Sequence, residues 1–458
     1  MNERKKYRSW NGYSVAFVLM TIIALLNVSC TDRTIYEPDS GSARPQPESH
    51  CRNKPDTSCS SGTLPVLHIN TENNDPIKSK EEYIQAVWWI DALGLDGYES
   101  IGSERAPYGM QIKGHGNITW TQPQKKPYRI KLDEKHKMLG MPSSRHWVLL
   151  ANANSWMGKM NDALPFEIGR RMGMSWNPRI EPVEVVLNDE YIGLYFLTEK
   201  IRVAKERVNI KEQADLETNP YKVTGGWLLE IDNYIEPDNI TFTEGNGKPF
   251  WVTPHSPELL SKEQRDYITS FLVKADSAIY LEDKNNRLWE QFIDIDALAI
   301  YYIVQEAVDN PEAFSGSCYL YKQQGPNSKL IFGPLWDCGS SFHRWSNTYE
   351  FNNFIYENMP DYCRSRWIGE IVKFPHFQER VRHYWRIFYE EVYPTMDAYM
   401  DYFAAKIESA CEADFVRWPQ YSSNNNTLRL NRFARPSFHK KVAWLNSIWG
   451  KSQLVLKK

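Results

Sequence analysis

The sequence lacks several features that would place it in a common class of protein. It has no run of about 20 apolar residues, which is the length that a membrane-spanning helix needs. Its net charge is only −3 and its pI is about 6.4, which gives no sign of nucleic-acid binding. No segment repeats at a fixed period, so neither a propeller nor a solenoid is supported. The cysteines of the second half lack the Cys-x-x-Cys spacing of a structural zinc site: Cys318, Cys338, Cys363 and Cys411.

The N-terminus has the pattern of an export signal. Four basic residues come first: Arg4, Lys5, Lys6 and Arg8. A short apolar run follows at 15–28, and a small residue, Ser29, precedes Cys30. We therefore expect residues 1–29 to be a lipoprotein signal peptide and Cys30 to carry the lipid, which predicts a lipid-anchored protein of the cell envelope, at the outer membrane or cell surface. The alternatives are an ordinary signal peptide with a chance cysteine and an uncleaved signal anchor.

Residues 30–63 are rich in Ser, Pro, Asp and Arg and poor in apolar side chains. Such a stretch cannot bury enough surface to offset the entropy of ordering it. We expect a flexible tether between the lipid and a globular domain. Whether Cys51 and Cys59 form a disulfide is left open by the sequence.

The rest of the chain divides into a β-rich first part and a helix-rich second part. Alternating apolar patterns predict strands at 64–70, 83–90, 108–113, 126–132, 182–187, 191–197, 225–232, 317–322 and 329–332. Residues 147–151 fit a strand or the start of a helix. Helical spacing predicts helices at 160–172, 261–281, 289–307, 377–405 and 437–449. Strands followed by helices favour an α+β fold, with a cleft between the two parts.

Three groups of residues have the types needed for phosphate or metal chemistry. Gly114, His115, Gly116 and Asn117 could bring backbone amides close to a phosphate, and Lys131 follows on the next predicted strand. Glu167 lies on the predicted helix 160–172. Asp309, Glu312, Ser317 and Asp337 surround the last predicted hairpin, and oxygen ligands of this kind suit magnesium. Each group also has a simpler interpretation. The glycines could form a plain turn, Glu167 could be a surface carboxylate, and the acids near the hairpin could only solvate it.

Several ordered motifs resemble the spore-coat CotH family of atypical protein kinases. They lie at 114–120, 125–133, 138–142, 147–152, 187–195 with Glu199, and 333–337. The resemblance implies a divergent, two-lobed protein-kinase-like fold, with a kinase core at 64–345 and a helical C-terminal extension at 346–458 packed on it. It also implies transfer of phosphate from ATP to an exported protein, with magnesium or manganese as the metal.

By the same resemblance, Lys131 contacts ATP and Glu167 is its helix partner. Asp337 holds the metal with Ser317, and Glu312 takes the place of the family's catalytic Asp. Asp309 is a second candidate for the catalytic residue. Two positions depart from the family pattern: Glu312 stands where the family has Asp, and His115 where it usually has Arg. Because a misplacement of about 1 Å can cost about a hundredfold in rate, these changes predict a weakened site. The alternative function is therefore a catalytically impaired lipoprotein for surface attachment, assembly or glycan binding. The sequence leaves the oligomeric state open.

Overall fold

The computed structural model describes residues 60–153, 158–342, 351–357, 366–421 and 434–451. The chain divides into two compact units, Met1–Ser49 and His50–Lys458, and every described residue belongs to the second. The predicted signal peptide, the lipid site at Cys30 and the pair Cys51 and Cys59 lie outside the described residues. None of the described helices is long and apolar enough to cross a bilayer.

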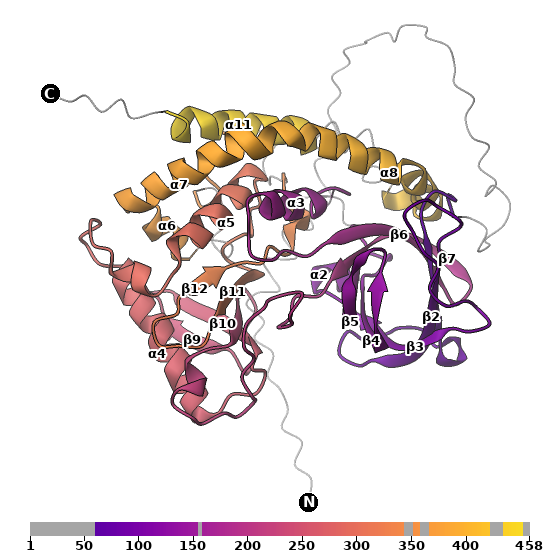
Figure 1. The fold of residues 1–458 in the computed structure, drawn as a ribbon, viewed down its shortest axis with the longest axis horizontal. Helices are drawn as coiled ribbons and strands as arrows, with labels where there is room; N and C mark the ends of the chain where they lie inside the picture. Colours follow the sequence, from indigo (N-terminus) through magenta and orange to yellow (C-terminus); the bar gives the residue numbers. More distant parts are fainter. Residues whose placement is uncertain (1–59, 154–157, 343–350, 358–365, 422–433, 452–458) are drawn as a thin grey trace, which may run out of the picture. The chain divides into compact units, whose positions relative to one another are not determined.

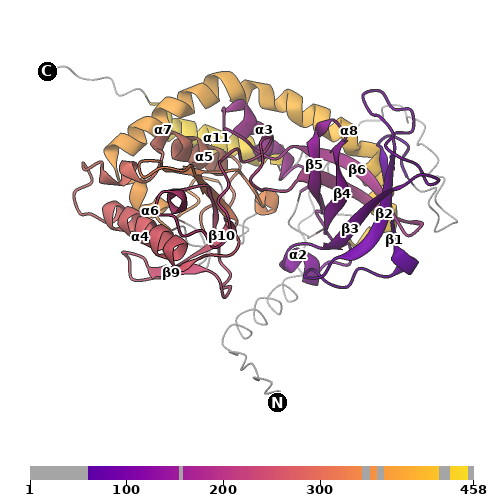
Figure 2. The ribbon, with the colours of Figure 1, turned by 60° about the horizontal axis from the view of Figure 1, so that its bottom comes forward.

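The first part of the described chain is a closed seven-stranded barrel (Figures 1 and 2). Its strands are β1 (Val66–Thr71), β2 (Ile84–Asp91), β3 (Tyr108–Gly114), β4 (Tyr128–Met138), β5 (Met141–Leu150), β6 (Ile180–Leu187) and β7 (Glu190–Glu199). The order is β1-β2-β3-β4-β5-β7-β6, and a parallel pairing of β1 with β6 closes the barrel. Alternate side chains, such as Ile130 and Leu132 of β4, fill the interior.

Local sequence signals explain the hairpins of the barrel. β6 and β7 are joined at Asn188 and Asp189, which have φ angles of 51° and 63°. Two successive positive φ angles are typical of the tight turns that match the twist of paired strands, and Asn and Asp tolerate them. The predicted hairpin is confirmed. Residues 147–151, for which the sequence allowed a strand or a helix start, belong largely to strand β5.

A second sheet follows the barrel. It consists of β8 (Trp227–Ile231), β9 (Ile240–Thr243), β10 (Pro249–Ser256), β11 (Cys318–Lys322) and β12 (Leu330–Phe332), in the order β12-β11-β8-β10-β9. The hairpin of β11 and β12 was predicted, whereas β9 and β10 were not. β8 lies at the centre of this sheet, between β11 and β10. The ends of β8, β11 and β12 carry most of the acidic residues discussed below.

The longer helices are α3 (Ala163–Arg171), α4 (Lys262–Ile279), α5 (Ile295–Ala307), α7 (Pro375–Ile387), α8 (Met396–Arg417) and α11 (Arg435–Trp449); α2 (Ile118–Thr121) and α6 (Ile368–Ile371) are single turns. One predicted helix was too long, and another is divided by a change of helix type. The helix expected from residue 289 starts only at Ile295, because Asp294 caps it by accepting hydrogen bonds from the amides of Asp296 and Ala297. The helix expected at 377–405 lies within one continuous helical segment, but a π turn (Phe388–Val392) and a 3-10 turn (Tyr393–Thr395) separate α7 from α8, and Pro394 in the second turn cannot donate a backbone hydrogen bond.

The structure confirms a mixed α+β class with a sheet-rich N-terminal part and helices toward the C-terminus. The two-lobed kinase-like architecture is not evident, because the strands of the first part close into a barrel. One hydrophobic cluster contains residues of α3, of the second sheet and of the C-terminal helices α7, α8 and α11. The C-terminal helices therefore share their core with the strands that carry the site.

Candidate functional site

The predicted acidic residues come from segments that flank strands β11 and β12. Glu312 lies between α5 and β11, Ser317 directly precedes β11, and Asp337 follows β12. The Ser317 hydroxyl donates a hydrogen bond of 3.4 Å to Asp337 Oδ2, and the Ser340 hydroxyl one of 3.4 Å to Glu312 Oε2. Glu312 and Asp337 lie near enough to repel each other electrostatically. The structure thus brings together three residues that the sequence singled out.

Asp162 is a further acid of this group, and it was not predicted. It directly precedes α3, and its Oδ1 accepts a hydrogen bond of 3.0 Å from the amide of Cys338. Its Oδ2 accepts a bond of 3.4 Å from the Asn152 side chain. The neighbouring Asn161 amide donates to the carbonyls of Gly339 and Ser341, at 2.7 and 2.9 Å. The start of α3 therefore holds the segment that follows Asp337.

Burial, together with the proximity of other carboxylates, raises the pKa values of several acids in this group. Burial, with a contribution from Asp337, raises the pKa of Glu312 to about 7 and that of Asp162 to about 7. Burial and the neighbouring Glu230 raise the pKa of Asp337, although its side chain is reached by solvent. Burial and Glu230 likewise raise the pKa of Asp232, to about 6. Such perturbed groups gather at functional sites, and their shared negative charge is suited to binding a cation.

Backbone conformation at these residues is uncommon. Asp337 has φ 53° and ψ 50°, in the left-handed region, and Ser317 has a φ of 50°. Positive φ angles at residues other than glycine cost free energy and cluster at functional sites. Asp is among the few residue types that adopt this conformation readily. The conformation turns the chain five residues after the end of β12 and places Asp337 beside Ser317.

The predicted glycine loop at the end of β3 reaches the same region. The ring of His115 lies edge-on to that of Trp336, with 6.4 Å between centroids. Asn117 hydrogen-bonds the side chain of Tyr234, which in turn is close to Glu312 and Asp337. The barrel loop and the acidic segment therefore lie close to each other.

The loop differs in detail from the phosphate-binding turn that we expected. The amides of Gly114 and His115 are already hydrogen-bonded to the carbonyls of Ser79 and Pro127, at 2.8 and 3.1 Å. A Cβ added at Gly114 would lie 2.6 Å from the Trp120 ring, so this glycine is needed for close packing. Burial and nearby cations, Arg129 first among them, lower the pKa of His115 to about 3. His115 is therefore neutral at pH 7.

Lys131 lies on β4, opposite Gln111 of β3 and His146 of β5. Arg129 is two residues earlier, so both side chains point out of the barrel on the same face. Lys200, which follows β7, belongs to the same basic face, and burial together with Arg129 lowers its pKa to about 7. Arg129 and Lys200 influence His115 electrostatically, so they are nearer to the loop than the sequence revealed. Because residues two apart on a strand point to the same face, the sequence position of Lys131 was enough to place Arg129 on that face as well.

Two expected roles do not match the positions that the structure gives. Glu167 was expected to pair with Lys131, but its carboxylate binds the guanidinium groups of Arg170 and Arg171 on the same helix. No ion pair between Glu167 and Lys131 is found within the described part of the chain. Asp309, the second candidate for the catalytic residue, has no exposed surface and forms an ion pair of 2.9 Å with Lys441. Glu312 is therefore the better placed of the two acids.

The residues near Asp337 are suited to a divalent metal of the magnesium type. In the described ranges, no group of three or more His, Cys, Asp or Glu side chains is arranged to hold a metal alone. Magnesium, however, commonly uses one or two carboxylates and takes its other ligands from water and phosphate. Asp337, with Asp162 and the Ser317 hydroxyl beside it, provides such a donor set, and the raised carboxylate pKa values indicate charge that a cation would neutralise.

Comparison with known proteins and families adds a second line of evidence. None of the curated proteins compared with the chain matches it. The profile of the CotH kinase protein family matches residues 112–447, which include the glycine loop, the acidic segment and most of the C-terminal helices. Because the match covers most of the chain, this protein belongs to the CotH kinase protein family.

Proposed function

We propose that this protein is an atypical protein kinase that transfers phosphate from ATP to exported proteins, in a reaction that depends on magnesium or manganese. The observation that carries the proposal is the convergence of Glu312, Asp337 and Asp162 beside the barrel loop of His115. Phosphoryl transfer needs positioning and charge neutralisation more than covalent chemistry. A site that combines an acid, a metal-binding carboxylate and a basic face supplies the required groups. The proposed fold is a divergent form of the two-lobed kinase, in which the barrel takes the place of the first lobe.

Glu312 is proposed to accept the proton of the acceptor hydroxyl. Its carboxylate has a single side-chain hydrogen bond within the described structure, from Ser340, which leaves one oxygen for a substrate. With its pKa raised to about 7, it is protonated or ionised in comparable amounts near neutral pH. A general base is most effective when its pKa is near the working pH. Glu312 thus suits this role even though the family pattern has Asp at this position.

Asp337 and Ser317 are proposed to hold the metal, with Asp162 close behind them. When bound, magnesium or manganese would neutralise the phosphate oxygens of ATP and orient them for in-line transfer. The basic face of Arg129, Lys131 and Lys200 would attract the same phosphates. Because His115 is neutral, the charge at the loop comes from these neighbours.

Location at the cell envelope completes the proposal. The N-terminus has basic residues, then a short apolar run, then Cys30, and this pattern supports a lipid anchor. The polar composition of residues 30–63 supports a tether of more than 30 residues. A kinase held in this way would meet exported proteins. Replacing Cys30 with Ser should move the protein from the membrane fraction to the soluble fraction.

The direct test uses the detergent-solubilised full-length protein with labelled ATP, magnesium or manganese and a mixture of exported proteins. Transfer should fall about 10²- to 10⁴-fold in Glu312→Gln, which loses the base. Asp337→Asn should abolish transfer, because the metal carboxylate is lost. Glu263→Gln, an exposed carboxylate of α4, is the matched control and should keep full activity. Nucleotide binding without transfer would instead indicate a pseudokinase, which is the alternative function.

A further inference from the structure

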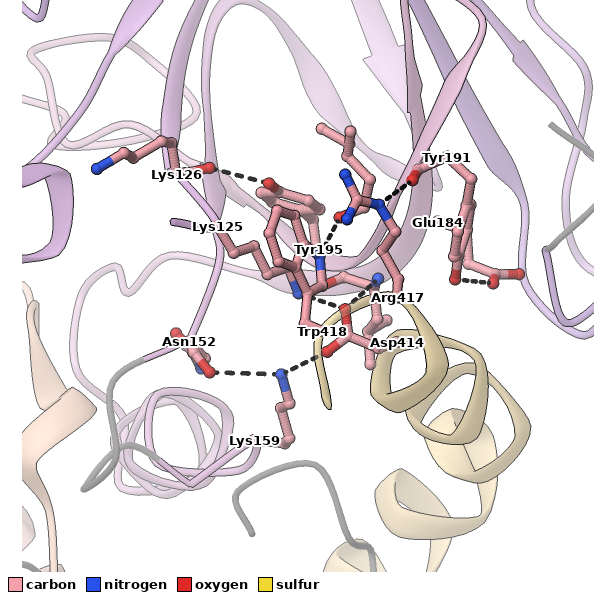
Figure 3. A network of polar contacts seen from close by, with 12 residues as sticks. Lys125, Lys126, Asn152, Lys159, Glu184, Tyr191, Tyr195, Asp414, Arg417 and Trp418 are labelled. Atoms are coloured by element: carbon pink, nitrogen blue, oxygen red, sulfur yellow. Dashed lines mark hydrogen bonds and ion pairs between the residues drawn. The ribbon is translucent and has the colours of Figure 1, made fainter. Parts of the chain in front are cut away.

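Asp414, on the C-terminal helix α8, lies at the centre of a buried polar network (Figure 3). Its Oδ1 accepts hydrogen bonds from Lys125 Nζ at 2.7 Å and from the amide of Leu194 at 3.0 Å. Its Oδ2 accepts one from Lys159 Nζ at 3.2 Å. The three charged side chains are at most 1% exposed. One carboxylate thus joins α8, the barrel strand β7 and the two segments that carry the lysines.

The charges in this network depend on one another. Burial alone would raise the pKa of Asp414, but Lys125 and Lys159 hold it below its usual range. Burial lowers the pKa of Lys125 to about 7, against the attraction of Asp414. Buried charges of this kind are tolerated only when they are paired, so the loss of Asp414 would leave two lysines without a counter-charge.

The network continues from Lys159 to the acidic segment. Lys159 Nζ donates to the carbonyl of Asn152 at 3.3 Å, and the Asn152 side-chain amide donates to Asp162 Oδ2 at 3.4 Å. Asp162 Oδ1 accepts from the amide of Cys338 at 3.0 Å. Cys338 directly follows Asp337. Hydrogen bonds, joined through the residue Asn152, therefore link α8 to the amide of Cys338, the residue next to the one proposed to bind metal.

We propose that Asp414 is a positioning residue for Asp337, acting through Lys159, Asn152 and Asp162, so that the C-terminal helix α8 holds the metal-binding segment in place. This inference rests on the proposed function for its catalytic consequence. Asp414 is buried, and its hydrogen bonds go to Lys125, Lys159 and Leu194 rather than to Glu312, Ser317 or Asp337. It fixes the residues that precede α3, and those residues bind the backbone of 338–341.

The backbone geometry of β7 supports a specific role for the contact between this strand and Asp414. Gly193 of β7 has a φ of 104°, and a Cβ added there would lie 2.2 Å from Asp414 Oδ1. The register of β6 and β7 is irregular at this point, where Val185 and Val186 pair with Gly193 and Tyr191. A bulge of this kind re-aims backbone groups, and here the amide of Leu194 points at Asp414. The sheet is thus locally shaped around the carboxylate.

The test compares Asp414→Asn with a control on the same helix in full-length protein. Lys406 of α8 also forms an ion pair with the barrel, 2.6 Å from Glu181, but it has no link to Asn152. Lys406→Gln is therefore the matched control. Mn²⁺ affinity, followed by the paramagnetic resonance of free Mn²⁺, should fall about 10- to 100-fold in Asp414→Asn and stay unchanged in Lys406→Gln. In transfer assays, kcat at limiting metal should fall while the KM for the protein acceptor changes little.

Asn152→Gly provides a second variant if Asp414→Asn does not fold. Asn152 has a φ of 42°, which glycine adopts without strain, and the substitution removes only the bond to Asp162 while the ion pairs stay. It should weaken Mn²⁺ binding by a similar factor. Wild-type Mn²⁺ affinity in Asn152→Gly, or an equal loss in Lys406→Gln, would overturn the inference.

Hydrogen exchange separates this inference from the proposed function. If the wild-type protein neither binds Mn²⁺ nor transfers phosphate, the proposed function fails. The positioning role is then decided by the amides of 334–341. Faster exchange in that segment in Asp414→Asn, and not in Lys406→Gln, supports the role. Unchanged exchange there contradicts it.

Discussion

In the folded protein, ionisation is unfavourable for three carboxylates of the acidic site: Glu312, Asp162 and Asp337. Residues with a purely structural role would avoid this cost. Asp162 is buried and Glu312 is half-buried, whereas solvent reaches Asp337, and each has a raised pKa because desolvation and like charge disfavour its ionised form. In the described part of the chain, this repulsion is offset by side-chain hydrogen bonds of 3.4 Å and by one bond of 3.0 Å from the Cys338 amide to Asp162. The arrangement is understandable if a cation completes it.

This view predicts how stability depends on pH and metal. The folded pKa values of Glu312 and Asp162, about 7, lie above the ordinary values of 4.5 and 3.8. The folded state therefore binds extra protons, and the stability that these groups contribute is present below about pH 4 and is lost as pH rises through about 7. A bound cation favours the ionised forms and should reverse this loss.

The measurement is the Tm of the full-length protein with and without manganese. The metal should raise the Tm more at about pH 8 than at about pH 5, because the carboxylates are ionised at the higher pH. Asp337→Asn should lose most of the difference. An equal rise at both pH values in the wild type would show that the metal binds elsewhere.

Single residues also show where sequence reasoning reached its limit. Glu312, Ser317 and Asp337 lie near one another in sequence, around one hairpin, and they were identified. Asp162 was missed because its contact with the acidic segment spans 176 positions. Lys131 was found from strand alternation, yet its supposed partner Glu167 is held by nearby arginines, since residues three and four apart on a helix meet first.

At the scale of elements, most strands and helices followed from local patterns, and the errors have local causes. The cap at Asp294 shortened one predicted helix, and a π turn followed by a 3-10 turn that contains Pro394 divides another into α7 and α8. Strands β9 and β10 had no strong alternating signal to separate them from loops. The alternating pattern of β7 does not reveal its close approach to α8, which depends on the missing side chain of Gly193.

Gly193→Ala should therefore destabilise the protein by more than a comparable change elsewhere. The positive φ alone costs about 1–2 kcal/mol, and the close contact with Asp414 should add roughly 1–3 kcal/mol from overpacking. Gly140→Ala is the control, because Gly140 has a φ of 79° and a Cβ there would meet nothing within 4 Å. Urea unfolding of both variants gives the difference. Equal free energies of unfolding for Gly193→Ala and Gly140→Ala would show that β7 and α8 can move apart without a loss of stability.

At the scale of the whole molecule, the C-terminal helices are joined to the site by two buried ion-pair networks. Asp414 of α8 reaches the segment after Asp337 through the contacts described above. Lys441 of α11 binds Glu306 at 3.0 Å and Asp309 at 2.9 Å, just before Glu312. Both sides of the acidic site are thus tied to residues beyond 400. The chain does not consist of a self-sufficient first part with an independent tail, because one core contains both.

Lys441→Met should lower the free energy of unfolding by about 3–5 kcal/mol, since it leaves two buried carboxylates without their cation. The adjacent Lys440 is exposed, so Lys440→Met is the control and should change stability by no more than about 0.5 kcal/mol. Chemical denaturation of the two variants provides the comparison. A loss in Lys441→Met as small as that of the control would contradict a structural role for this network.

The sequence by itself determined the α+β class, most element positions, the family and the residues around the β11–β12 hairpin. These properties depend on periodicity, turn residues and ordered motifs, which are local and legible along the chain. Only the tertiary structure decided that the strands close into a barrel, that Asp162 joins the acidic group and that Glu167 and Asp309 are engaged elsewhere. The physical reason is that burial and electrostatic proximity depend on contacts between distant segments, and a linear pattern does not specify which buried charges meet.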